Sequence, residues 1–159
     1  MTEIVTTARR PDLHQQARKA LRGGWPTFVL HDPLSNAYRR QVETYFADYD
    51  LLLLEDGEVV ADGRAVPLSW DGDVATLPDG YDGALVRAVT EHEGSVAPDT
   101  LCIMAVTVRP DRTRGGLAGR VIRALRDRAV EAGLHRVIVP VRPTLKASYP
   151  LASMADFAR

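Results

Sequence analysis

The spacing of hydrophobic positions changes along the chain from three or four residues to two, and then back again. Helical spacing predicts one helix over Asp12–Leu21, a second after Pro33, and a short third helix over Ala84–Glu93. The segment 71–83 is rich in Asp, Gly and Pro and is typical of a connection. Strands are predicted over Glu3–Thr7, Asp50–Glu55, Glu58–Trp70, Leu101–Val108 and Val137–Val141. Asp56-Gly57 indicates a hairpin turn between two of them.

The C-terminal third of the chain has the most regular pattern. Leu101–Val108 is apolar on both faces, as expected of a central strand, and Arg109–Gly116 is a loop rich in Pro, Arg and Gly. Leu117–Ala132 is a predicted helix whose apolar stripe consists of Val121, Ile122, Leu125 and Ala129. Since Val137–Val141 follows as a strand, these segments predict a βαβ unit.

Composition limits the kinds of partner. The chain has 159 residues, which fits one domain, with 45% hydrophobic and 26% charged residues. Lys and Arg number 20 against 21 Asp and Glu, so no strong positive charge drives binding to nucleic acid or anionic membranes. Neither a signal peptide nor a bilayer-spanning run is evident. One cysteine, Cys102, and four histidines show no metal-type spacing, so we expect a soluble, cytoplasmic domain without a metal.

The loop before the Leu117 helix contains a candidate anion site. Gly115 and Gly116 let a ligand approach the main chain closely, and the first amides of the helix point toward the loop. Nearby arginines, including Arg112 and Arg114, add positive charge. The alternative is a Gly-rich connection that binds no ligand and whose arginines simply lie on a solvent-exposed face of the helix. The spacing matches neither a P-loop nor the Gly-x-Gly-x-x-Gly dinucleotide fingerprint.

The run Val106–Ala118 resembles motif A of the GCN5-related N-acetyltransferase (GNAT) superfamily. Aligned on Pro110, it places Gly116 and Ala118 at the family's glycine and Gly/Ala positions, while Thr113 stands where Arg or Gln is usual. The upstream order of elements is also that of the family. The resemblance implies a single acyl-CoA-binding domain over residues 1–159. Its expected fold is an α+β three-layer GNAT-like one: a mixed, mostly antiparallel sheet with one parallel pair around the motif A helix.

The resemblance also implies an activity and its site. Acetyl-CoA would be the co-substrate, with its pantetheine arm paired to the backbone of Ala105, Val106 and Val108. Its diphosphate would be held by Arg114, Gly115, Gly116, Leu117, Ala118 and Gly119. A small-molecule or peptide amine would attack the thioester directly. Tyr149 is a candidate acid, or else a packing residue, and Glu91 is a candidate base.

The C-terminal segment from Val139 to Leu151 looks like that of a bacterial GNAT-like subgroup in which the chain continues further. We therefore expect the family's final strands to be missing here and Val137–Val141 to present an open edge, completed by a second subunit in a homodimer. Two other functions stay open: a non-catalytic acyl-CoA-binding or dimerisation module, and a nucleotide-binding α/β domain. The sequence does not identify the acceptor.

Overall fold

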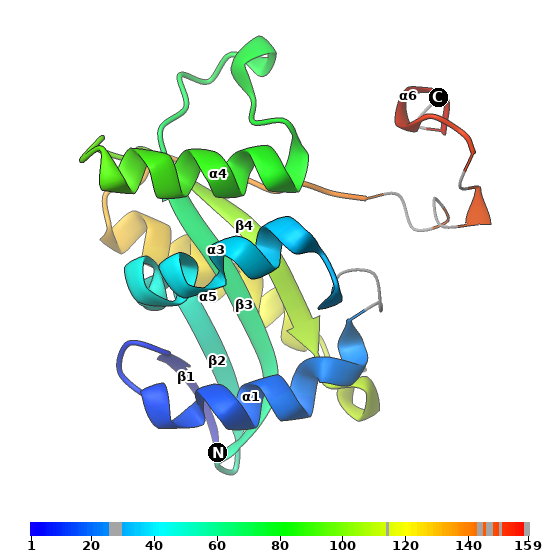
Figure 1. The fold of residues 1–159 in the computed structure, drawn as a ribbon. Helices are drawn as coiled ribbons and strands as arrows, with labels where there is room; N and C mark the ends of the chain where they lie inside the picture. Colours follow the sequence, from blue (N-terminus) through cyan, green and yellow to red (C-terminus); the bar gives the residue numbers. More distant parts are fainter. Residues whose placement is uncertain (26–29, 114, 143–144, 146–147, 150, 158–159) are drawn as a thin grey trace.

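A five-stranded mixed sheet forms the centre of the molecule (Figure 1). The computed structural model describes residues 1–25, 30–113, 115–142, 145, 148–149 and 151–157. The strands lie in chain order across the sheet: β1 (Thr2–Thr6), β2 (Asp50–Glu55), β3 (Glu58–Leu68), β4 (Thr100–Val108) and β5 (Arg136–Ile138). The first four are antiparallel neighbours, whereas β4 and β5 are parallel. This confirms the predicted mixed sheet with one parallel pair.

Helices cover both faces of this sheet (Figure 1). The helices that do so are α1 (His14–Leu21), α3 (Pro33–Tyr45), α4 (Gly80–Glu93) and α5 (Leu117–Glu131), and a short helix, α6 (Met154–Phe157), lies near the end of the chain. Helix α5 lies on one face, and α1, α3 and α4 lie on the other. Among the described residues, none of the helices has both the length and the apolar character needed to cross a membrane.

Helix α5 packs closely against the sheet because its buried residues recur every four positions. They are Leu117, Val121, Leu125 and Ala129. The sequence pattern also places Ile122 in this stripe, but the residue is 46% exposed, since a residue next to Val121 in sequence points about 100° away around the helix. Gly63 on β3 permits the close approach: a Cβ there would lie 2.3 Å from Val121 Cγ1.

The opposite face of the sheet has two separate apolar clusters. The α1 cluster consists of Leu13, Ala17, Leu21, Leu52, Leu54 and Val59. The α4 cluster consists of Phe46, Val66, Leu68, Ala84, Leu85, Ala88, Val89, Cys102 and Met104. Cys102 is fully buried there, and burial raises the pKa of its thiol to about 12, which agrees with the interpretation of this residue as a small hydrophobe.

The two largest differences from the predicted boundaries are at α4 and β5. Helix α4 begins at Gly80 rather than Ala84, because Gly80 and Gly83 suggest a loop by composition yet lie within the helix. Strand β5 ends at Ile138 rather than Val141, and Pro140, which has no N–H group to donate, lies just beyond it.

The segment that follows β5 leaves the body of the domain. Figure 1 shows it, in orange and red, extending away from the sheet toward α6. Several of its apolar side chains are exposed, among them Val141 and Leu151. Within the described residues β5 is the outermost strand on this side of the sheet. Completion of that edge by a second subunit stays a prediction.

Candidate functional site

Strand β4 is irregular at its centre. Ala65 pairs with Ile103 and Arg64 pairs with Ala105, so Met104 is an extra residue that forms a bulge. On its other side, β4 pairs with β5 only from Thr100 to Cys102 among the described residues. The two parallel strands therefore stop pairing just before the bulge, and Ala105–Val108 have no pairing with β5 among the described residues.

The start of α5 presents backbone donors beside this strand. Gly115 and Gly116 have φ angles of 129° and 70°, a region that favours glycine. Gly116 is the N-cap residue, and within the described chain no side chain caps the helix. The first intrahelical bond runs from the Arg120 N–H to the Gly116 carbonyl, 3.1 Å, which leaves the three amides between them outside the helical pattern. A Cβ on either glycine would meet nothing within 4 Å, so there is open space beside both residues.

The arginines of the loop are partly engaged elsewhere. Arg109 pairs with Glu58 at 3.1 Å and with Asp111 at 2.7 Å, and Arg112 lies 3.6 Å from Glu55. Arg123 is exposed on α5. The uncapped amides at the start of α5 add partial positive charge of their own.

A buried group of charged residues lies on the face of the sheet opposite α5. We call Asp50, Asp62 and Arg64 the polar layer. The Arg64 guanidinium lies 3.7 Å from a carboxylate oxygen of each aspartate. Arg64 pairs in register with Asp50 on β2 and with Ala105 on β4, so the layer lies across the sheet at the level of the β4 bulge.

The pKa values of the polar layer reflect its burial. Burial raises the pKa of Asp50 to about 6, against the opposing effect of Arg64. Burial also raises the pKa of Asp62, opposed by Arg64 and by hydrogen bonding from Thr107. For Arg64, burial lowers the pKa, but the two aspartates together outweigh this and raise it.

Sequence reasoning does not find the polar layer. In the sequence, Asp62-Gly63 is typical of a bend or bulge interrupting the Glu58–Trp70 strand. The sequence feature that could have indicated the polar layer is the two-residue spacing of Asp62 and Arg64. This spacing places two opposite charges on one face of an otherwise apolar strand.

Family comparison decides what kind of domain this is. The model of the acetyltransferase (GNAT) family matches residues 11–157. The chain belongs to the GNAT family. It is 30% identical over 168 residues to the arginine N-acetyltransferase avaD of Aspergillus versicolor, covering 97% of this chain and 57% of that protein. The chain thus spans little more than half the length of this curated relative.

Solved GNAT structures share the fold. A GNAT family acetyltransferase from Brucella melitensis in complex with acetyl-CoA has a TM-score of 0.56 at 15% identity, covering 96% of this chain and 84% of that one. The loading GNATL domain of CurA from Lyngbya majuscula has a TM-score of 0.62 at 12% identity, covering 97% and 71%. These likenesses confirm the GNAT-like fold expected from motif A.

The predicted cofactor-binding residues of this GNAT domain fall in two neighbouring places. Ala105, Val106 and Val108 are half-buried on β4, beyond the last pairing with β5. The others lie at the start of α5, where Gly115 and Gly116 are exposed, Ala118 and Gly119 are half-buried, and Leu117 is buried. Arg114 lies outside the described residues. The role of all these residues in binding stays a prediction.

The two predicted catalytic side chains lie apart from this arrangement. The Glu91 carboxylate accepts hydrogen bonds from the Ser69 N–H and from the Ser69 hydroxyl, both at 2.7 Å. Tyr149 is 56% exposed in the segment that leaves the domain, with its ring 5.6 Å from that of Phe157. Both roles stay predictions.

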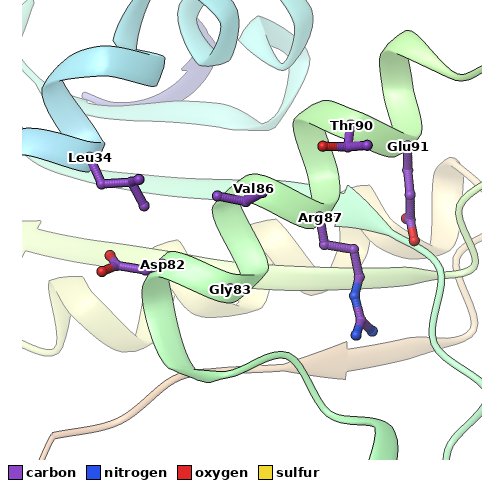
Figure 2. Close-up of a pocket in the computed structure, with 7 residues that line it drawn as sticks. All are labelled: Leu34, Asp82, Gly83, Val86, Arg87, Thr90 and Glu91. Carbon is purple, nitrogen blue, oxygen red and sulfur yellow. The ribbon is translucent and has the colours of Figure 1, made fainter.

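Glu91 also borders a hollow of about 610 Å³ between α3 and α4. Its lining residues are Leu34, Asp82, Gly83, Val86, Arg87, Thr90 and Glu91 (Figure 2). Arg87 donates to the Thr76 carbonyl at 3.1 Å, so this side chain, like that of Glu91, has a partner within the fold. No group of three or more His, Cys, Asp or Glu side chains among the described residues could hold a metal ion.

Proposed function

We propose that this chain is an acetyl-CoA-dependent N-acetyltransferase that acts on an amine. The observation that carries the proposal is that β4–β5 pairing ends at Cys102 and leaves the rest of β4 unpaired on that side, up to the loop that leads to the uncapped start of α5. An extended acyl carrier fits along the unpaired part of β4, and its diphosphate fits the amides of α5. Family membership and the arginine N-acetyltransferase relative support the same activity.

The residues present fit acetyl-CoA because a Cβ at Gly115 or Gly116 would point into open space, where a diphosphate needs room. When bound, acetyl-CoA supplies an activated thioester, from which an amine takes the acetyl group. The amides of Leu117, Ala118 and Gly119 would orient its diphosphate, with the positive end of the α5 dipole behind them. Backbone groups of Ala105–Val108 would align its arm and polarise the carbonyl.

Titration calorimetry with CoA tests the proposed binding site through a matched pair of variants. Gly116 and Gly133 lie at opposite ends of α5 with φ angles of 70° and 73°, and at either position an added Cβ would meet no atom within 4 Å. An alanine at either position should cost about 1 kcal/mol of folding stability through the same backbone strain. Gly116→Ala should also weaken CoA binding roughly tenfold by crowding the amides, which corresponds to about 1.4 kcal/mol.

Gly133→Ala should bind CoA as the parent protein does. Equal affinities of the two variants, or no CoA binding by the parent protein, would contradict the site.

Release of free thiol from acetyl-CoA in the presence of amines tests the reaction. Arginine is the first amine to examine because the relative is an arginine N-acetyltransferase. The expected result is amine-dependent thiol release together with a product heavier by one acetyl group. The amine gains the acetyl group and loses a proton, the carbon–sulfur bond breaks, and CoA leaves as the thiol.

A second candidate is a non-catalytic acyl-CoA-binding module. Thr113 in place of the usual Arg or Gln, and the placement of Tyr149 in the segment that leaves the domain, favour it. It predicts CoA binding without thiol release for any amine in the panel.

A further inference from the structure

The polar layer contains most of the buried side-chain polar atoms that make no hydrogen bond among the described residues. Four buried side-chain atoms in the described chain make no hydrogen bond: His14 Nε2, Asp50 Oδ1, Asp62 Oδ1 and Arg64 Nε. Three belong to the polar layer. The fourth, on α1, lies 3.4 Å from Glu43 of α3. Asp50 Oδ1 and Arg64 Nε face each other at 3.7 Å, which is an ion pair too long for a hydrogen bond. The Asp62 side chain is the most deeply buried of the three, and because buried polar atoms are normally paired, its oxygen without a hydrogen bond points to a site that binds a polar ligand.

The ion pairs within the layer leave the aspartates with hydrogen-bonding capacity. Both distances from Arg64 are 3.7 Å, longer than the 2.7–2.9 Å typical of a charge-assisted hydrogen bond. The Asp62 side chain is 2% exposed and that of Asp50 is 14% exposed, whereas Arg64 is 37% exposed. The layer is therefore deep at Asp62 and reaches solvent at Arg64.

The charges around the layer favour a cation. Asp50, Asp62 and Glu43 supply three carboxylates, and Glu43 acts electrostatically on both Asp50 and Arg64. Against them stands the single guanidinium of Arg64. A ligand with several N–H donors and a positive charge matches both the unpaired carboxylate oxygens and this excess of negative charge.

The position of the layer connects it to the acyl-transfer site. Asp62 pairs in register with Thr107, and Arg64 with Ala105. Both β4 residues belong to the stretch beyond the last β5 pairing, so the layer adjoins the strand that would hold the acyl carrier.

We propose that Asp50 and Asp62 bind the acceptor, and that this acceptor is a small molecule bearing a cationic amine or guanidinium on a slender arm. A slender arm is needed because the Asp62 carboxylate lies at the bottom of the layer. This inference rests on the proposed function and adds the substrate class and the residues that recognise it.

Binding of arginine and of butylammonium to the CoA-saturated protein tests this inference without requiring turnover. Asp62→Asn and Asp50→Asn should each weaken binding of these probes about tenfold or more, since each removes a charged hydrogen-bond acceptor. Neither substitution should change CoA affinity by more than about twofold. Asp127→Asn, which removes an exposed carboxylate of α5, is the matched control and should bind both ligands as the parent protein does.

Two results would overturn the inference: unchanged probe binding in both aspartate variants, or no binding of either cation by the CoA-saturated parent protein. Thermal melting of each variant identifies loss of fold, and two separate aspartates are tested so that one unfolded variant does not decide the outcome. Failure of the proposed function gives a different result, namely loss of CoA binding or of thiol release in the parent protein.

Discussion

Asp50 illustrates how one buried carboxylate affects stability. Its pKa is about 6 in the folded protein and 3.8 as an ordinary aspartate, with burial as the main cause. Between these values the folded protein binds a proton that the unfolded chain does not. Stability therefore falls as pH rises through this window, and above pH 6 the ionised carboxylate costs on the order of 3 kcal/mol.

Asp50→Asn should consequently raise the free energy of unfolding at pH 7.5, by up to on the order of 3 kcal/mol. The gain should shrink as pH falls below 6 and vanish near pH 3.8. Urea denaturation at several pH values measures it, with Asp127→Asn as an exposed comparison. A gain that does not change with pH would show that burial of the charge is not its source. Increased stability with weaker acceptor binding is the pattern expected of a functional residue.

At the scale of elements, the contact between β3 and α5 depends on the absence of a side chain at Gly63. A Cβ there would lie 2.3 Å from Val121 and 3.0 Å from Leu125, both buried on α5. The helix could move away only by losing these contacts and by shifting its N-terminal amides relative to β4.

Gly63→Ala should therefore lower the free energy of unfolding by about 1–3 kcal/mol through overpacking. Gly23→Ala is a suitable control because its Cβ would make an ordinary 3.4 Å contact with Pro110, and it should change stability by less than about 0.5 kcal/mol. Chemical denaturation of both variants measures the difference. Equal free energies of unfolding for the two variants would mean that α5 accommodates the added methyl group at position 63 without loss of stability.

The same glycine shows what the sequence can and cannot predict. The β4–loop–α5 unit is predictable because a long apolar run, a glycine pair and a regular helical stripe follow one another. Gly63 suggests a local bend, whereas the structure uses it for contact with a helix that begins more than fifty residues later. The charges on either side of it are not recognisable as one group with Asp50, because Asp50 comes from another strand and only pairing of β2 with β3 brings it near.

At the scale of the whole molecule, the face of the sheet opposite α5 carries charged side chains in its middle and apolar side chains toward both ends. Apolar side chains occupy both ends of this face, as the α1 cluster and the α4 cluster. The polar layer lies on the same strands between them. Strand order and family can be predicted from the sequence, but this division cannot, because it depends on which helix covers which part of the sheet.

The division into two clusters also has a mechanical consequence for α1. This helix is anchored through Ala17 and Leu21, which pack in one cluster with Leu13, just before the helix, and with side chains of β2 and β3. Each buried leucine contributes about 1.5–3 kcal/mol. Tilting α1 outward would thus cost these contacts and the one between His14 and Glu43 of α3, while the α4 cluster kept its own packing.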